Sequence, residues 1–452
     1  MAGEELVGAL PAGWEYTTLG EACARAGGDV QTGPFGSQLH AADYVSRGIP
    51  SIMPQNIGDN RVVREGIAQI TVEDAERLNR YRVRTGDIVY SRRGDVERRA
   101  LIRDAEDGWL CGTGCLRVRF GDEHVNPTFA SYYLGDPNVR EWIVRHAHGA
   151  TMPNLNTAIL AALPFVLPPL PDQRAIAHIL GTLDDKIELN RRINATLEAM
   201  ARALFKSWFV DFDPVRAKAE GRKPGLPQPL AHLFPGSFED SELGKIPRGW
   251  TVGPILDHAR LMSGGTPRTD RPEYWDGPIS WASAKDVSQS HGSILVNTGR
   301  TITPQGLEES ATQMIPAFCS VVVARGATTG RMVLFGRDMA MNQTCYALAT
   351  TTRTPCALYC RLRVEIDALV HAAHGSVFDT ITTSTFASSR VVLPARPVLM
   401  AFEERIAPAF KRVMGSIYES LNLAALRDAL LPKLISGELR VNVGEHPLGR
   451  AV

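Results

Sequence analysis

Two long segments of the chain place apolar side chains at the three- and four-residue spacing of an α-helix. The first begins near Asp172 and ends before Pro214, with one polar interruption at Asn190, and the second lies within residues 393–452. Such a stripe is typical of a coiled-coil seam. The apolar positions are Ile176, Leu180, Leu183, Ile187, Ile193, Leu197, Met200 and Leu204 in the first segment, and Ile406, Phe410, Val413, Ile417, Leu421, Leu423, Leu426, Leu430 and Leu434 in the second.

Each predicted helix carries a stripe that the other could cover. A helix of about 35 residues is about 50 Å long, which exceeds the diameter of a domain of about 160 residues. The alternative, in which each helix packs only on its own domain, therefore leaves much of the stripe uncovered. We predict an antiparallel pair, because the chain must return through a whole domain between the two helices.

Prolines mark the ends of the first helix. In "LPPLPDQ" (167–173) the pyrrolidine rings disfavour a helix interior, so we predict that the helix starts after Pro171 with Asp172 as its cap. Pro214 ends it soon after "SWFVDFD". A fainter copy of the same junction, "LPARPVLMAFEERI", begins at Leu393 and predicts the start of the second helix.

The chain also repeats itself. "PAGWEYTTLGEA" resembles "PRGWTVGPILDHA", and "IVYSRRG" resembles "VVVARG". Several matches in one order indicate a tandem duplication. The matched pairs are Trp14 with Trp250, Arg93 with Arg325, and Leu167 with Leu393, at offsets of 236, 232 and 226 residues.

Outside the long helices the pattern changes to short β-type runs bounded by Gly and turn residues. Examples are "GDIVYSRRG", "CLRVRF", "CSVVVARG" and "RMVLF". These runs predict strand-rich domains with some helices. The expected fold is α+β, with two tandem strand-rich domains separated by two long helices that form an antiparallel coiled coil, and with a pseudo-twofold internal repeat.

Composition changes this picture little. The 452 residues hold 49 Lys and Arg against 49 Asp and Glu, and no apolar run reaches the roughly 18 residues of a membrane span. Seven cysteines, an odd number in a large chain, favour free thiols over a disulfide framework. The first residues carry acids where a secretory signal would carry basic residues. We therefore expect a cytoplasmic protein without a membrane segment.

Three segments resemble the specificity subunit of type I restriction-modification systems. Residues 167–221 are similar to its central helical region, residues 426–441 ("LRDALLPKLISGELRV") to its distal helical region, and residues 242–250 to the entry of its second target-recognition domain. The resemblance covers essentially the whole chain. It implies a non-catalytic subunit whose two recognition domains, held apart by the helices, each read one half of a split, asymmetric DNA target.

The resemblance also implies an organisation and a set of partners. It assigns residues 1–166 to the first target-recognition domain, 167–236 to a central helical spacer and linker, 237–392 to the second target-recognition domain, and 393–452 to the distal helical spacer. The implied partners are double-stranded DNA, two methyltransferase subunits and restriction-translocase subunits. No cofactor or metal is expected on this chain, whereas S-adenosylmethionine, ATP and Mg²⁺ are expected on the partner subunits.

A local basic stretch is the first candidate for DNA contact. From Arg77 to Arg103 the chain holds nine arginines against three acids, as phosphate contact requires, although a solvated surface would look the same. Within the stretch, "SRRGD" ends a β-run in a Gly turn and leaves Arg92 and Arg93 at a strand end, where a guanidinium can bind guanine O6 and N7. "ARGATTGR" (324–331) occupies the equivalent place in the second half.

Loops of small and polar residues complete the candidate interface. "QTGPFGSQ" (31–38) and "SGGTPRT" (263–269) lie at similar distances past Trp14 and Trp250, and each could otherwise be an ordinary surface turn. "MNQTC" (341–345) adds amides that could read adenine. The predicted DNA-binding residues are Gln31, Thr32, Ser37, Gln38, Arg92, Arg93, Thr266, Arg268, Lys285, Arg325, Thr328, Thr329, Asn342 and Gln343.

Catalytic motifs are incomplete. "NPTF" (126–129) approaches the Asn-Pro-Pro-aromatic loop of amino-methyltransferases, but Thr128 replaces the second proline, and Asn126 as a helix cap explains the motif better. Asp172 with "DDK" (184–186) imitates the acid-and-lysine set of a metal-dependent nuclease, but on a helix an exposed charged face is the better interpretation. We expect no enzymatic activity.

Two C-x3-C pairs could suggest zinc. They are Cys111 with Cys115 and Cys356 with Cys360, and His371 and His374 lie near the second pair. Zinc ribbons usually use tighter C-x2-C pairs, and Cys115 instead aligns with Cys345 in the repeat. Structural thiols are therefore expected.

A coiled-coil scaffold that organises protein partners without reading DNA is the alternative function. The two hypotheses differ over the basic strand-end loops, because a scaffold would not need them.

Overall fold

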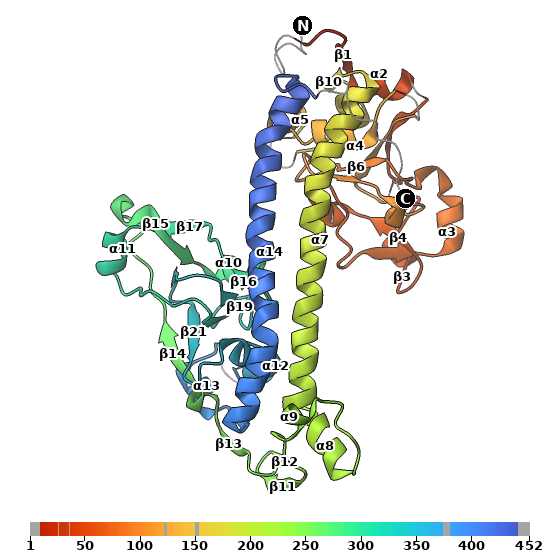
Figure 1. Cartoon of the computed structure of the whole chain (residues 1–452). Coiled ribbons are helices and arrows are strands. Elements are labelled where there is room, and N and C mark those ends of the chain that lie inside the picture. The colour runs from red at the N-terminus through yellow and green to blue at the C-terminus, as the bar shows by residue number, and fades with distance from the viewer. Residues whose placement is uncertain are drawn as a thin grey trace. The chain divides into compact units, whose positions relative to one another are not determined.

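The structure is a computed structural model that describes residues 10–25, 27–35, 37–121, 124–149, 153–373 and 380–441 (Figure 1). The chain divides into two compact units. Unit 1 contains Met1–Ile187 and Asn422–Val452, and unit 2 contains Glu188–Leu421. Each unit holds one strand-rich domain and a segment of both long helices. Because this division cuts across the helices, the domain boundaries given by the resemblance stay a prediction.

The two long helices are α7 (Leu170–Phe209) and α14 (Arg396–Ser436) (Figure 1). In unit 1, Leu180 of α7 shares an apolar core with Leu431 of α14. In unit 2, the ring of Phe205 of α7 lies 5.6 Å from that of Phe402 of α14. The early part of one helix thus meets the late part of the other in each unit, so the predicted antiparallel pairing is confirmed.

The start of α7 differs from the prediction. The helix begins at Leu170, and the N–H groups of Asp172 and Gln173 both donate to the carbonyl oxygen of Pro169, at 2.9 and 3.1 Å. Pro171 is tolerated because N–H groups in the first turn have no partner within the helix. Asp172 is therefore not the cap, and its carboxylate instead accepts a hydrogen bond from Trp14 Nε1 at 3.0 Å.

The apolar seam is also narrower than predicted. Met200, Leu421 and Leu426 are 62%, 39% and 49% exposed. Ala201, one position after Met200, is buried instead, and the buried stripe continues through Phe205. After the polar interruption, the register of the stripe shifts by one residue, which the spacing pattern alone did not specify.

Among the described residues, unit 1 contains three antiparallel or mixed sheets. In the main sheet, the strand order is β2-β9-β6-β7. The strands are β1 (Glu15–Thr18), β2 (Asp29–Thr32), β3 (Tyr44–Val45), β4 (Ile49–Ile52), β5 (Ala68–Ile70), β6 (Ile88–Ser91), β7 (Arg99–Leu101), β8 (Leu110–Cys111), β9 (Cys115–Arg119) and β10 (Pro164–Leu167). The helices are α2 (Leu19–Arg25), α3 (Val72–Arg77), α4 (Pro127–Tyr133), α5 (Pro137–His146) and α6 (Thr157–Ala161). Asn126 caps α4 by accepting a hydrogen bond from the N–H of Phe129 at 2.9 Å, as predicted.

Unit 2 repeats this topology with additions. Its main sheet has the order β14-β21-β18-β19-β16. The strands are β11 (Phe238–Ser241), β12 (Gly244–Pro247), β13 (Thr251–Pro254), β14 (Ala259–Ser263), β15 (Trp275–Ala282), β16 (Ile294–Leu295), β17 (Arg300–Ile302), β18 (Ser320–Val323), β19 (Met332–Phe335), β20 (Ala340–Met341), β21 (Cys345–Thr350) and β22 (Arg390–Leu393). The helices are α8 (Asp213–Ala219), α9 (Gln228–Ala231), α10 (Ala284–Gln289), α11 (Pro304–Glu308), α12 (Pro355–Ala373) and α13 (Thr383–Ser388). Pro214 thus lies in the first turn of α8 rather than simply ending α7.

Strand registers confirm the internal repeat. Ser91 pairs with Cys115 in unit 1, and Val323 pairs with Cys345 in unit 2. The outer strands repeat as well, because β1 pairs with β10 antiparallel, as β13 does with β22. The predicted α+β fold with two similar strand-rich domains and an antiparallel helix pair is therefore confirmed. Within the described residues, none of the helices combines the length and the apolar content needed to cross a membrane.

Candidate nucleic-acid interface

A turn at the end of β6 lies at the centre of the candidate interface in unit 1. The strand ends at Ser91, and the N–H of Arg92 donates to the carbonyl oxygen of Gly114 at 2.8 Å. The carbonyl oxygen of Arg92 accepts from the N–H of Leu155 at 2.9 Å, and Arg93 forms a β-bridge with Asn154. The two arginines therefore lie at a strand end, as predicted, between two other segments of the chain.

Glycine brings the first candidate loop against this turn. A Cβ atom on Gly33 would lie only 2.1 Å from the carbonyl oxygen of Gly112, so no larger residue fits without a shift of the backbone. Two residues further on, the ring of Phe35 is 52% exposed and lies 5.9 Å from the guanidinium of Arg92. The two predicted loops of unit 1 thus meet.

The polar residues of this loop mostly hold it together. The Oε1 atom of Gln38 accepts from the hydroxyl of Tyr81 at 2.8 Å and from the N–H of Phe35 at 3.2 Å. Thr32 donates to the carbonyl oxygen of Gly33 at 2.8 Å. Gln31 is half-buried in β2, whereas Ser37 is exposed.

Unit 2 repeats the arrangement residue by residue. The N–H of Ala324 donates to the carbonyl oxygen of Thr344 at 2.8 Å, the carbonyl oxygen of Ala324 accepts from Ile381 at 2.9 Å, and Arg325 forms a β-bridge with Thr380. A Cβ atom on Gly264 would lie 2.1 Å from the carbonyl oxygen of Asn342. Arg325 is therefore the counterpart of Arg93, as predicted, and residues 342–344 are the counterpart of residues 112–114.

The predicted residues of unit 2 differ in their freedom to contact a ligand. Gln343 is hydrogen-bonded to Thr266, which joins the two candidate loops. The Oδ1 atom of Asn342 already accepts from the hydroxyl of Thr344 at 2.8 Å, and Arg268 forms an exposed ion pair with Asp270 at 2.8 Å. The hydroxyl of Thr329 donates to the carbonyl oxygen of Gly326, and Thr328 is half-buried. Lys285 on α10 and Arg325 are exposed.

Two tryptophans that the sequence did not single out hold the loop 263–269. Trp281 Nε1 donates to the carbonyl oxygen of Gly265 at 3.0 Å, and Trp275 Nε1 donates to that of Arg268 at 3.1 Å. The guanidinium of Arg300 lies 3.4 Å from the centre of the Trp275 ring. Both tryptophans look like ordinary core residues of a strand, so no sequence pattern identified this role.

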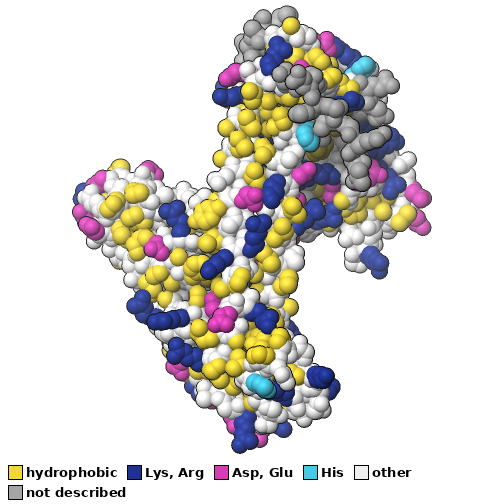
Figure 2. Space-filling view, viewed as in Figure 1, with side chains coloured by type: hydrophobic (Ala, Val, Ile, Leu, Met, Phe, Trp, Pro, Cys, Tyr) yellow, Lys and Arg dark blue, Asp and Glu magenta, His cyan; other side chains and the backbone are white. Residues whose placement is uncertain are grey.

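Much of the basic stretch is structural. The Nε atom of buried Arg99 donates to the carbonyl oxygen of Ser131 at 2.6 Å, and burial lowers the pKa of Arg99. On the face seen in Figure 2, Lys and Arg side chains are scattered among acidic and apolar ones. The prediction of phosphate contact is therefore restricted to those arginines of residues 77–103 whose side chains form no hydrogen bond or ion pair within the chain. The arginines bonded within the chain include Arg77, Arg80, Arg82, Arg98 and Arg99.

Asp184 is not on an exposed charged face, which corrects the prediction. Its side chain is 6% exposed, accepts from the hydroxyl of Tyr132 at 2.6 Å, and forms an ion pair with Arg427 at 2.6 Å. Burial alone would lower the pKa of Arg427, but the hydrogen bond and charge of Asp184 raise it. Within unit 1 this network joins α4, α7 and α14.

The cysteines are structural thiols. All seven are free and buried, and burial raises the pKa of the Cys111 and Cys345 thiols to about 12. No group of three metal-ligating side chains occurs among the described residues. His371 and His374, which the sequence placed near the second pair, lie outside the residues whose side chains the structure describes.

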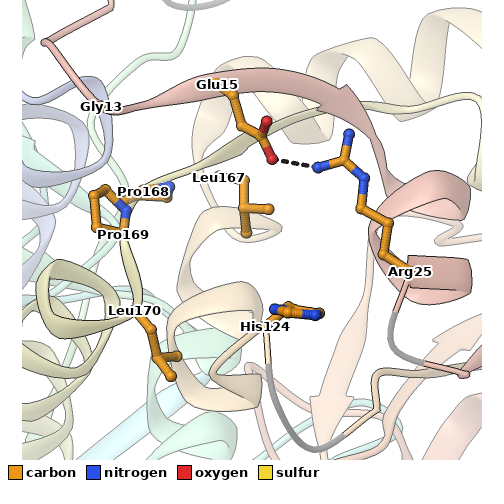
Figure 3. A pocket seen from close by; sticks show the side chains of 8 residues that line it. All are labelled: Gly13, Glu15, Arg25, His124, Leu167, Pro168, Pro169 and Leu170. Carbon is orange, nitrogen blue, oxygen red and sulfur yellow. Dashed lines mark hydrogen bonds and ion pairs between the residues drawn. The ribbon is translucent and has the colours of Figure 1, made fainter.

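A cavity of about 500 Å³ lies elsewhere in unit 1, where β1 and β10 meet the start of α7 (Figure 3). Glu15 and Arg25 form an ion pair at its edge, which offsets the charge of the arginine. None of the predicted DNA-binding residues lines this cavity. It is therefore not part of the candidate interface.

Comparisons with known proteins agree with this architecture. Residues 11–199 match the family model described as "Type I restriction modification DNA specificity domain". The chain is 26% identical over 440 residues to the type I restriction enzyme HindI specificity subunit of Haemophilus influenzae, covering 86% of this chain and 95% of that protein. It is 21% identical over 453 residues to the MjaIX specificity subunit of Methanocaldococcus jannaschii, covering 96% and 95%.

A solved structure shows the same fold. The S subunit of a type I restriction-modification system from M. genitalium aligns over 93% of this chain and 96% of its own, with a TM-score of 0.56 and 13% identity. The class defined by the fold is thus a two-domain protein with an antiparallel helix pair. The resemblance of the whole chain to type I restriction-modification specificity subunits is confirmed.

Proposed function

We propose that this chain is the DNA sequence-recognition subunit of a type I restriction-modification complex, and that each strand-rich domain reads one half of a split target. The matched strand-end turns carry the proposal. Arg93 beside Asn154, and Arg325 beside Thr380, hold the same place at the end of equivalent strands, next to equivalent glycine-anchored loops. An arginine in such a turn can bind guanine in the major groove.

The two domains should read different bases. Arg92 has Ala324 as its counterpart, because their backbones form equivalent hydrogen bonds. The N–H of Arg92 donates to Gly114 and its carbonyl oxygen accepts from Leu155, whereas the N–H of Ala324 donates to Thr344 and its carbonyl oxygen accepts from Ile381. Thr113 has Gln343 as its counterpart, since each follows the residue that packs under the loop glycine. Different side chains at equivalent places favour an asymmetric target.

The partner surfaces follow from the same repeat. Met200 on α7 and Leu426 on α14 are counterparts at the offset of 226 residues, and both are exposed apolar side chains, at 62% and 49%. Single exposed apolar side chains are common on protein surfaces, so the equivalence of the two positions in the repeat carries the inference. We infer two similar docking sites for two methyltransferase subunits.

The segment that follows α7 contributes little to that surface. Within "SWFVDFDPVRAK" (207–218), Trp208 and Phe209 are 1% and 5% exposed, and both rings contact Phe402. Only neighbouring residues such as Val210, which is 40% exposed, remain available. Mass measurement of the saturated complex should find two methyltransferase copies, and Met200→Glu or Leu426→Glu should each remove one. A single copy at saturation would contradict the inference.

The chain's role in this proposal is non-catalytic. Chemistry that needs S-adenosylmethionine, ATP and Mg²⁺ is assigned to methyltransferase and restriction-translocase partners, and the cytoplasmic location remains a prediction.

Binding of the full chain to selected and to random duplexes at several salt concentrations tests the proposal. Phosphate contacts weaken steeply with salt for every sequence, whereas base contacts preserve a ratio between sequences. We expect a selected duplex to bind more tightly than random duplexes throughout the series. Equal binding to all duplexes would favour the scaffold alternative.

A further inference from the structure

Three buried polar atoms beside the Arg92–Arg93 turn of unit 1 have no hydrogen-bond partner. They are Nε of Arg92, Oγ1 of Thr113 and Oδ1 of Asn154. A folded chain normally pairs such atoms, because burial removes their hydrogen bonds to water without replacing them. Several unpaired atoms in one place therefore need an explanation.

The three residues belong to one continuous strip. Thr113 lies between Gly112, which packs under Gly33, and Gly114, which accepts from the N–H of Arg92. On the other side of the turn, Asn154 forms its β-bridge with Arg93. The strip thus runs from Asn154 across the two arginines to Thr113, at the end of β6 where the candidate interface lies.

The equivalent strip of unit 2 meets its own hydrogen-bonding needs. The counterpart of Arg92 is Ala324, which has no polar side-chain atom. The counterpart of Thr113 is Gln343, which is hydrogen-bonded to Thr266. The unpaired atoms of unit 1 are therefore not a general property of this turn.

We propose that Thr113 and Asn154 are specificity-determining residues for the half-site read by unit 1. This inference rests on the proposed function and deepens it. The amide of Asn154 can accept from N6 of adenine while donating to N7, and the hydroxyl of Thr113 can accept or donate at a base edge next to a guanine bound by arginine. Because the unpaired atoms are covered in the free chain, a χ1 rotation of each side chain accompanies binding.

Two shape-conserving variants test the inference. Thr113→Val removes the hydroxyl, and Asn154→Leu removes the amide, at similar volume. The full chain, bound to its methyltransferase partner, is measured against duplexes in which each half-site is randomised separately. Each variant should relax base preference by about tenfold at a position in one half-site and leave the other half-site unchanged.

Stability distinguishes this role from a structural one. Since each variant removes an unpaired buried polar atom, its urea midpoint should equal or exceed that of the unmodified chain. The matched control is Thr182→Val in α7, where the exposed threonine donates to the carbonyl oxygen of His178 at 2.7 Å. This control should change neither half-site.

The outcomes separate the inference from the proposed function. If both variants keep the original base preferences while Arg93→Ala relaxes one half-site, Thr113 and Asn154 do not determine specificity and the proposed function stands. A lower urea midpoint with weaker binding to every duplex would assign them a structural role and overturn the inference. If the unmodified chain shows no sequence preference, the proposed function itself fails.

Discussion

Asn190 lies against Ser416, its own counterpart in the internal repeat. The Nδ2 atom of Asn190 is 3.5 Å from the carbonyl oxygen of Ser416, 226 residues further along the chain, and also donates to Glu419 at 2.9 Å. Two equivalent helices bring a residue against its counterpart only near the midpoint of an antiparallel pair. Both residues are fully buried, so a polar layer interrupts the apolar seam at this point. Such a layer fixes the register of paired helices.

This polar layer is the place to test whether the helices set the length of the unread spacer. Four residues would be inserted before Asn190 in α7 and four after Ser416 in α14, so that the register of the helix pair is preserved. Each helix would then be about 6 Å longer, which corresponds to nearly two base pairs of DNA. Selection of bound duplexes should return a longer spacer and the same half-sites. The same insertion after Gly221, in an exposed turn, is the control. A changed half-site with an unchanged spacer would show that the helices do not set the spacer length.

Asp184→Asn should destabilise unit 1. The substitution removes the buried carboxylate that pairs with the half-buried guanidinium of Arg427, which then keeps only the exposed Asp428, so the free energy of unfolding should fall by about 1 to 3 kcal/mol. Urea unfolding measures the loss. Asp185→Asn, at the exposed neighbouring position, should change the free energy of unfolding little. Equal effects of the two variants would show that the network contributes nothing specific.

The two strand-end turns should act independently. Replacing Arg92 and Arg93 with Ala should relax recognition of one half-site, and Arg325→Ala should relax the other, at about 1 to 3 kcal/mol for each lost bidentate contact. Binding to duplexes with one altered half-site at a time measures both effects. If every sequence lost affinity uniformly, these arginines would contact phosphates instead of bases.

The stability of unit 2 should depend on the ionisation of Glu198. Burial raises its pKa from the ordinary value of 4.5, more than the hydrogen bond from Ser293 and the nearby Arg202 and Arg363 lower it. A raised carboxyl pKa contributes stability below the unfolded pKa, and this contribution is lost as the pH rises through the folded pKa. The unmodified chain therefore loses this stability as the pH rises, whereas Glu198→Gln does not. The free energy of unfolding of Glu198→Gln, relative to that of the unmodified chain, should be higher at about pH 8 than at about pH 4. Urea unfolding at both pH values tests this, with Glu404→Gln at an exposed position as the control. A difference independent of pH would contradict the expectation.

Periodicity and repetition predicted the fold because they are properties of long segments. The apolar stripes around Leu180 and Phe410 identified two long helices, and the aligned Arg93 and Arg325 identified two similar domains. The sequence failed where a single residue's partner lies far along the chain. Asp184 looked like an exposed acid because its partners, Tyr132 and Arg427, are 52 and 243 residues away.

The candidate interface was predicted in parts. Strand-end arginines and glycine loops were recognisable because each has a local pattern, and the structure brings them together. Thr113 and Asn154 were missed because an isolated Thr in a turn or Asn before a helix has no distinctive spacing. Trp275 and Trp281 were missed because tryptophans in a strand usually indicate core packing. The roles of these residues follow from their neighbours in space, which periodicity does not encode.

Selection of duplexes from a random pool by the full chain with its methyltransferase partner tests the central claim most directly. If each strand-rich domain reads one half-site, the bound sequences should share two short fixed segments that differ from each other and are separated by a fixed number of unread base pairs. A bound pool as random as the starting pool, or one with a single continuous or symmetric fixed segment, would contradict the account.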